Sequence, residues 1–243
     1  MRKILTGILI LSFWISWGLL AANDPSLVGS WSFDETSGTN AADGSGSGLN
    51  GHSSAAWAAG KIGGAVLLDG DKTRLIRITL PSEKQFGRSS FTVACWIHPN
   101  RFDIESTQKQ RRFFGFEKWP DYFVVGDVMS DGKLNFSVGG RSGTNAPGVN
   151  ASLYAKDPVP LKEWTHVVMV CDRETGVLRV YINGFLSSVL PVPQNFSESV
   201  NLSGDKPVTV GSIWQSFDGL VDELKIWKRV LKPDEARAVY QGK

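Results

Sequence analysis

Acidic side chains are the first candidates for chemistry in this chain, because a glycan hydrolase needs two carboxylates about 5 to 10 Å apart. The adjacent acids Asp222 and Glu223 lie in the stretch FDGLVDELKIW, whose alternating apolar residues predict a strand. Neighbouring residues of a strand point to opposite faces of a sheet, so these two carboxylates cannot work as an acid and base pair. The same argument separates Asp34 from Glu35 if the first strand continues through them.

Asp222 falls in register with apolar residues of its predicted strand. Leu220, Leu224 and Ile226 share its face, whereas Glu223 lies on the other face. A lone carboxylate on an apolar face is costly unless it is neutralised or accepts hydrogen bonds. We therefore predict that Asp222 has a partner, which the sequence alone does not identify.

Other catalytic patterns are absent from the sequence. The histidines His52, His98 and His166 are isolated from one another, and His166 follows a Trp-Thr pair that favours a structural role. The sequence contains no nucleophile elbow, no glycine-rich phosphate loop and no cysteine or histidine spacing typical of zinc. We predict no catalytic residue, and an enzyme whose groups escape these patterns stays open as an alternative.

Short alternating runs separated by Gly, Asn and Asp predict an all-β chain folded as a sandwich or barrel. Asn183 and Gly184 predict a type I′ hairpin, and Gly176 closes the hairpin before it. One short helix is expected near the end, beginning at Pro233. The predicted strands are Leu27–Phe33, Ala65–Leu68, Leu75–Thr79, Phe91–His98, Phe113–Phe116, Tyr122–Val125, Leu134–Gly139, Thr165–Cys171, Val177–Ile182, Phe185–Leu190, Val208–Gly211 and Leu220–Trp227.

The N-terminus carries a targeting pattern. Arg2 and Lys3 precede an apolar run over residues 4–20, and small residues follow it, which is typical of a secretory signal peptide at residues 1–22. An uncleaved membrane anchor is the alternative, because the run is close to the minimum length of a transmembrane helix. Residues 23–243 are predicted to form one domain that is secreted, periplasmic or at the cell surface.

The charge of the remaining chain restricts its partners. Removing the two basic residues of the leader leaves as many basic as acidic residues, and no block of like charges is present. This balance argues against nucleic acid as a partner. No second long apolar run exists, so no membrane insertion is expected after cleavage of the leader.

A family pattern runs through the chain from Leu27 to Tyr240. The motifs are GSWSFDETSGT, DGSGSGLNG, GKIGGAVLLDG, SFTVACWIHP, WTHVVMVCDRETGVLRVYING, VTVGS and FDGLVDELKIWKRVLKPDEARAVY. In this order they resemble the LamG-like jelly-roll domains of the concanavalin A-like superfamily. The resemblance implies two antiparallel sheets packed face to face, one concave and one convex. It leaves function open, because this fold includes lectins, adhesion modules and glycan-degrading enzymes.

The resemblance also implies a structural calcium ion. Many sandwiches of this superfamily hold calcium against the last strand, and the matching positions here are Asp222, Asp34, Asp69 and Gly70, the last through its carbonyl. Three carboxylates with carbonyls and water would suit calcium, which takes six to eight oxygens. The alternative is that Asp222 accepts backbone N–H groups or pairs with a basic residue.

The two cysteines are predicted to be unpaired. Pentraxins look similar over two of these motifs, and their disulfide would fall near Ala94 and Val168 in this sequence. Cys95 and Cys171 are displaced from those positions by about four residues of register in total. That offset is roughly 13 Å, whereas the Cα atoms of a disulfide lie within about 7 Å.

The stretch between residues 98 and 122 is the most individual part of the sequence and our predicted ligand surface. Its arginines could bind carboxylated or sulfated glycans, and exposed tryptophans can stack on sugars. The predicted ligand residues are Arg111, Arg112, Trp119, Tyr122 and Trp214. We predict a non-catalytic module that binds a glycan or another extracellular polymer. A glycan hydrolase or lyase of the same fold and a protein-binding adhesion module are the alternatives.

Overall fold

The alternating runs form two antiparallel sheets in the computed structural model, which describes residues 24–102, 110–141 and 147–243. Sheet A has one path of seven hydrogen-bonded strands, and β1 pairs separately with β16. Its strands in spatial order are β14 (Phe185–Pro191), β13 (Val177–Ile182), β12 (Thr165–Asp172), β7 (Phe91–Pro99), β16 (Asp218–Trp227), β5 (Gly64–Asp69) and β4 (Ala56–Ala59), with β1 (Leu27–Trp31) beside β16.

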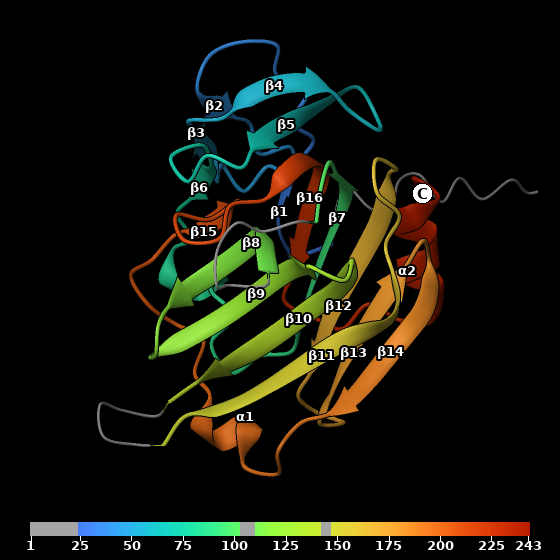
Figure 1. The fold of residues 1–243 in the computed structure, drawn as a ribbon. Coiled ribbons are helices and arrows are strands. Elements are labelled where there is room, and N and C mark those ends of the chain that lie inside the picture. Colours follow the sequence, from blue (N-terminus) through green and yellow to red (C-terminus); the bar gives the residue numbers. More distant parts are fainter. Residues whose placement is uncertain (1–23, 103–109, 142–146) are drawn as a thin grey trace, which may run out of the picture.

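Sheet B packs against sheet A, and Figure 1 shows β8 to β11 lying across the strands of sheet A. Its strands in spatial order are β11 (Val149–Pro158), β10 (Lys133–Gly140), β9 (Tyr122–Met129), β8 (Gln110–Lys118), β15 (Val208–Val210), β6 (Ile76–Ile78), β3 (Gly51–Ser53) and β2 (Asn40–Ala41). The predicted jelly-roll sandwich is therefore confirmed.

The core lies between the sheets, where aromatic and aliphatic side chains from both layers interdigitate. Phe91 of β7 contacts Phe86 at 4.3 Å and Phe136 of β10 at 6.4 Å, measured between ring centroids. A second, smaller apolar cluster lies on the outer side of sheet A, where helix α2 (Pro233–Tyr240) buries Ala236. The predicted C-terminal helix is confirmed and covers part of that outer face.

Both predicted hairpins are present. Asn183 and Gly184 have φ values of 51° and 79°, as a type I′ turn requires. The earlier hairpin joins β12 to β13 with Gly176 at φ 66°. Strand β11 is a difference from the prediction: it was not expected, because its sequence VNASLYAKDP contains Asn, Lys, Asp and Pro, which are depleted in strands. It is the edge strand of sheet B, where such residues are tolerated.

A β-bulge in β16 changes the predicted face of Asp222. Asp222 is opposite Trp96 and Lys225 is opposite Ala94, so β16 contains one more residue than β7 over this interval. The extra residue is Glu223, whose φ of 51° lies in the left-handed region. Such a residue resets the alternation of the strand.

The alternation therefore changes side at the bulge. Val221, Leu224 and Ile226 point into the core between the sheets. Asp222 shares its face with Trp96, its cross-strand partner, which contacts helix α2 outside that core. The prediction that Asp222 lies on the same face as Leu224 and Ile226 is wrong, because strict alternation does not hold across a bulge.

The cysteines lie where the sequence placed them. Cys95 is opposite Val167 and Cys171 is opposite Phe91, so the thiols are offset along neighbouring strands. Both cysteines are buried and unpaired, as predicted.

The predicted signal peptide, residues 1–22, lies outside the described residues. Within the part of the chain that the structure describes, no helix has the length and apolar character needed to cross a bilayer.

Candidate functional site

Strand β10 shows how a polar surface forms on the outward side of sheet B. Leu134, Phe136 and Val138 point into the core, so the alternating residues Asn135 and Ser137 point away from it. Residues on the neighbouring strands continue this outward surface. We call it the polar face, and it consists of Arg112, Glu117, Phe123, Asp127, Asn135, Ser137 and Ser152.

A buried ion-pair cluster lies at the centre of the polar face. Arg112 donates from Nε to Asp127 Oδ1 at 2.9 Å, and its Nη1 donates to Glu117 Oε1. The side chains of Arg112 and Asp127 are only 7% and 1% exposed. Burial opposes the charge of Arg112, but the two carboxylates outweigh it and raise the pKa of the guanidinium. Burial also raises the pKa of Asp127, even beside this cation.

A β-bulge positions Arg112. The register between β8 and β9 shifts between Arg112 and Phe114, so Phe113 and Phe114 are both buried in the core. Arg112 is left on the outward side opposite Asp127, while the preceding Arg111 donates to the Ser216 carbonyl at 3.3 Å. The two neighbouring arginines therefore have different surroundings.

Next to the ion pairs lies a hydrogen-bonded strip of neutral side chains. Ser137 Oγ donates to Asn135 Oδ1 at 2.9 Å and, having one proton, accepts from Ser152 Oγ at 2.8 Å. Asn135 is 3% exposed, yet its Nδ2 has no hydrogen-bond partner among the described residues. An unpaired buried donor is costly, so a ligand that supplies an acceptor here would be stabilised.

An aromatic pair borders the polar face at the end of β8. Trp119 is 72% exposed, and its ring centroid lies 5.1 Å from that of Phe123. Phe123 lies across the sheet opposite Gly139, where an added Cβ would come within 2.5 Å of the Phe123 ring. The absence of a side chain at Gly139 therefore lets Phe123 lie over the sheet beneath Trp119.

The remaining predicted ligand residues are not all at this place. Tyr122 is 3% exposed, contacts Phe116 in the core and accepts the Lys206 backbone N–H at its hydroxyl. The prediction that Tyr122 lines the ligand surface is wrong, because alternation in β9 turns it inward. Trp214 is 65% exposed but follows β15 in the loop whose Gln215 carbonyl accepts from the Arg112 N–H.

Trp214 thus lies by the first residues of β8, whereas Trp119 follows its last residue. Eight residues of strand separate these ends by roughly 26 Å. Arg112 and Trp119 therefore lie on the outward side of sheet B, near opposite ends of β8, whereas Arg111 lies opposite Val128 of the core and Trp214 lies beside the start of the strand.

The residues that the sequence analysis missed come from strands β9 and β10. Asp127, Asn135 and Ser137 alternate with buried apolar residues in FVVGDVM and KLNFSVGG. This polar alternation was a usable signal. The pairing of Asp127 with Arg112 could not be read from the sequence, because it joins residues on different strands.

Asp222, which is buried, is hydrogen-bonded to the backbone of the β4–β5 turn. Its Oδ2 accepts the backbone N–H groups of Lys61 at 2.8 Å and Ile62 at 3.0 Å. The side chain is fully buried, and burial raises its pKa to about 6. The alternative in which Asp222 accepts backbone N–H groups is therefore the arrangement seen at Oδ2, and it holds the β4–β5 turn against β16. The other oxygen, Oδ1, is buried without a hydrogen-bond partner among the described residues.

The four residues expected to bind calcium divide into two pairs. Asp34 accepts the Gly64 N–H at 2.6 Å, near the turn that Asp222 holds. Asp69 and Gly70 follow at the other end of β5, roughly 17 Å away, where Asp69 pairs with Arg74. Because the two pairs lie at opposite ends of β5, these four residues do not form one calcium shell.

Among the described residues, no group of three or more His, Cys, Asp or Glu could hold a metal ion. A structural calcium ion stays a prediction without an assigned set of ligands. Melting EDTA-treated protein with and without millimolar calcium tests it, because an ion that binds only the folded state raises the melting temperature.

A family model described as the concanavalin A-like lectin/glucanases superfamily matches residues 75–237, about two thirds of the chain. Adhesion G-protein coupled receptor D1 of Homo sapiens is 33% identical over 123 residues, a match that covers 45% of this chain and 13% of the receptor. The chain therefore corresponds to a small part of that receptor.

Two solved structures illustrate the fold. The binding domain of Paraclostridial Mosquitocidal Protein 1 has a TM-score of 0.69 at 15% identity, over 89% of this chain and 52% of that one. Domain 4 of AbnA, a GH43 extracellular arabinanase from Geobacillus stearothermophilus solved with arabinotriose, has a TM-score of 0.59 at 23% identity. That match covers 89% of this chain and 98% of the arabinanase domain.

A third similar structure is the ligand-binding domain of botulinum neurotoxin serotype D in complex with N-acetylneuraminic acid. Its TM-score is 0.65 at 15% identity, over 90% of this chain and 51% of that one. The chain spans about half the length of each of the two toxin domains. The TM-scores of these three structures establish a shared fold, and their sequence identities support no closer relationship.

Proposed function

The chain belongs to the concanavalin A-like lectin/glucanase superfamily, and on this basis we propose that it is an exported, non-catalytic module that binds a glycan or another extracellular polymer. The ligand lies on the polar face. The observation that carries this proposal is the buried Asn135 Nδ2, a donor without a partner among the described residues of this outward surface.

The polar face complements the chemistry of a sugar. Asn135, Ser137 and Ser152 present amide and hydroxyl groups that can exchange hydrogen bonds with sugar hydroxyls. Trp119 presents a largely exposed ring at the border, and such a ring stacks on the apolar C–H face of a sugar. A rigid sheet with polar side chains and one exposed aromatic is suited to surface recognition of a polymer.

The carboxylates of the polar face argue for binding rather than hydrolysis. A glycosidase keeps one carboxyl group protonated as the acid while the second attacks or activates water. Here one guanidinium bonds both Asp127 and Glu117 and occupies an oxygen of each carboxylate, so the two are held as partners of Arg112. We therefore propose that Asp127 and Glu117 hold Arg112 in place on the binding surface and have no catalytic role.

The comparisons support both glycan and protein as the class of ligand. Two similar structures are complexes, one with arabinotriose and one with N-acetylneuraminic acid. The adhesion receptor that matches part of the chain favours protein recognition as the second candidate. The unpaired amide and the exposed Trp119 ring favour a glycan.

Replacing Trp119 by alanine lowers the affinity for the bound glycan by roughly thirtyfold, because a tryptophan that anchors a ligand is worth about 2 kcal/mol. A glycan array identifies the ligand, and titration calorimetry of the variant measures the loss. Trp214→Ala is the matched control, since Trp214 is similarly exposed but lies at the other end of β8. Equal losses in the two variants, or no loss for Trp119→Ala, would contradict placement of the ligand on the polar face.

Polysaccharides that bind this protein are expected to stay intact during prolonged incubation. Release of reducing or unsaturated ends would identify a hydrolase or a lyase and contradict the non-catalytic assignment. A chain that binds no glycan but captures an extracellular protein domain would support the adhesion alternative.

A further inference from the structure

A hollow lies on the same outward side of sheet B as the polar face, at the end of the sheet opposite β11. Its volume is about 350 Å³, and it lies over β2, β3 and β6. The residues that line it are Thr39, Asn40, Asn50, Gly51, His52, Arg77 and Thr79. All seven are neutral or basic, so no carboxylate lines this hollow.

Strand alternation and register assemble the hollow. Arg77 lies between Ile76 and Ile78, which are buried in the core, so its side chain points outward. His52 is directly opposite Arg77 on β3, and Asn40 is opposite His52 on β2. Directly opposed residues share a face, so three donor side chains lie in one row across three strands.

The donors of this row are available. Neither Arg77 nor His52 makes a side-chain hydrogen bond or ion pair with any residue that the structure describes, and Arg77 is exposed. Asn50 accepts the Asp43 N–H through Oδ1, which directs its hydrogen-bond acceptor away and leaves its amide Nδ2 to donate. By contrast, Arg112, Arg179 and Arg229 are each bonded to a carboxylate.

The row connects the hollow to the polar face. Arg77 is opposite Thr209 of β15, and Thr209 is opposite Gly115 of β8, from which the register continues through Val125 to Ser137. A Cβ on Gly115 would lie 3.0 Å from Thr209 Oγ1. Because Gly115 has no side chain, no side chain of β8 rises above the sheet at this point between Arg77 and Ser137. Four strand spacings separate Arg77 from Ser137, roughly 19 Å, which an oligosaccharide can span and a monosaccharide cannot.

We propose that this hollow binds the carboxylate or sulfate group of an acidic glycan whose neutral part lies on the polar face. The proposal rests on the proposed function and names the ligand class of that surface. Arg77 supplies a planar fork that matches an oxyanion with two parallel hydrogen bonds. The amides of Asn40 and Asn50 supply neutral donors to the same group, and the absence of a lining carboxylate avoids repulsion.

The test uses matched polysaccharides in affinity electrophoresis of residues 23–243. One pair is polygalacturonate and its methyl ester, and the other is a sulfated galactan and its desulfated form. The wild-type protein is retarded more by the acidic member of at least one pair, and which pair shows the difference distinguishes carboxylate from sulfate. Arg77→Gln lowers affinity for that acidic polymer roughly tenfold and leaves retardation by the neutral form unchanged.

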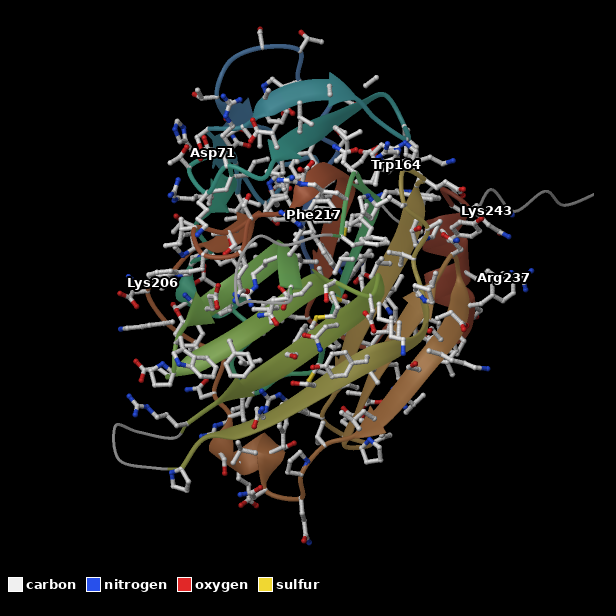
Figure 2. The ribbon with its side chains drawn as sticks, viewed as in Figure 1. Asp71, Trp164, Lys206, Phe217, Arg237 and Lys243 are labelled. Atoms are coloured by element: carbon white, nitrogen blue, oxygen red, sulfur yellow. The ribbon has the colours of Figure 1, made fainter. Side chains whose placement is uncertain are left out.

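Arg237→Gln is the matched control, because it removes the same charge from α2 on the outer side of sheet A (Figure 2), where the guanidinium lies 5.1 Å from the centroid of the Phe185 ring. It keeps the preference for the acidic polymer. Equal retardation by acidic and neutral forms, or a preference that persists in Arg77→Gln, overturns this inference and leaves the proposed function standing. Retardation by none of the four polymers overturns the proposed function and the inference with it.

Discussion

Replacing Arg112 by methionine lowers the free energy of unfolding by about 3–5 kcal/mol, because the buried Asp127 carboxylate loses its counter-ion. The methionine fills much of the same volume, so the loss reports charge rather than a cavity. Glu117 also loses a partner, but it is more exposed and contributes less. Urea denaturation at neutral pH measures the effect from the change in midpoint at constant slope.

The double variant Arg112→Met with Asp127→Leu recovers most of this stability, because removing both charges leaves no unpaired ion in the sheet. The matched control is Lys118→Met on the same strand, which breaks an exposed ion pair with Asp205 and changes stability by about 1 kcal/mol or less. If Arg112→Met lowered the free energy of unfolding by as little as Lys118→Met does, the explanation by a buried ion pair would be contradicted. A double variant as unstable as Arg112→Met would do the same.

The Arg112→Met variant also acquires a pH dependence whose sign can be stated. Burial raises the pKa of Asp127, and removing the guanidinium raises it further. A carboxyl group with a raised pKa in the folded state favours folding when it is protonated. The deficit of the variant relative to wild type therefore shrinks as the pH falls from 7 towards 4.

Replacing Asp222 by alanine lowers the free energy of unfolding by about 2–4 kcal/mol, because the buried N–H groups of Lys61 and Ile62 lose their acceptor. Glu223→Ala is the control on the adjacent residue, and it removes only a partly exposed ion pair with Lys225, worth about 1 kcal/mol or less. Thermal melts of both variants measure the difference. Equal effects would contradict the role of Asp222 as the residue that holds the β4–β5 turn.

Asp222→Asn separates the hydrogen bonds from the charge, since its amide oxygen can still accept both N–H groups. The pKa of Asp222 is about 6 in the folded protein against 3.8 for an unperturbed aspartate. Protonation therefore stabilises the fold: the gain is complete below about pH 3.8 and is lost as the pH rises through 6. This gain is worth about 3 kcal/mol.

The stability of the wild type relative to Asp222→Asn should accordingly rise as the pH falls from 7 to 4, measured as the difference between two urea midpoints at each pH. Groups shared by the two proteins cancel in this difference. A difference that stays flat over that range would show that the buried carboxylate does not titrate in the folded state.

Much of the architecture could be predicted from local sequence. The Asn183–Gly184 turn and the helix beginning at Pro233 follow from backbone preferences of single residues, and both are present. The offset of the two cysteines was implied by the resemblance to pentraxins together with the regular register of neighbouring strands, and it is observed. These features depend on few residues or on regular pairing, so they carry over from sequence to structure.

The composition of the polar face was harder to predict. Arg112 and Trp119 were anticipated, but Asp127 and Asn135 were missed, and Tyr122 was assigned to the surface although it points inward. A strand sequence shows which residues alternate, but not which side of the strand meets the other sheet. That choice depends on the packing of the two layers.

The sequence by itself determined an all-β sandwich with alternating strands, its hairpin turns, its terminal helix and the need of Asp222 for a partner. Only the tertiary structure decided which partner that is and which face it lies on. The reason is physical: one extra residue at Glu223 reverses the sides of β16, and the N–H groups that satisfy Asp222 come from a turn about 160 residues earlier in the chain. Contacts between such distant segments are set by how the sheets pack, which no local pattern records.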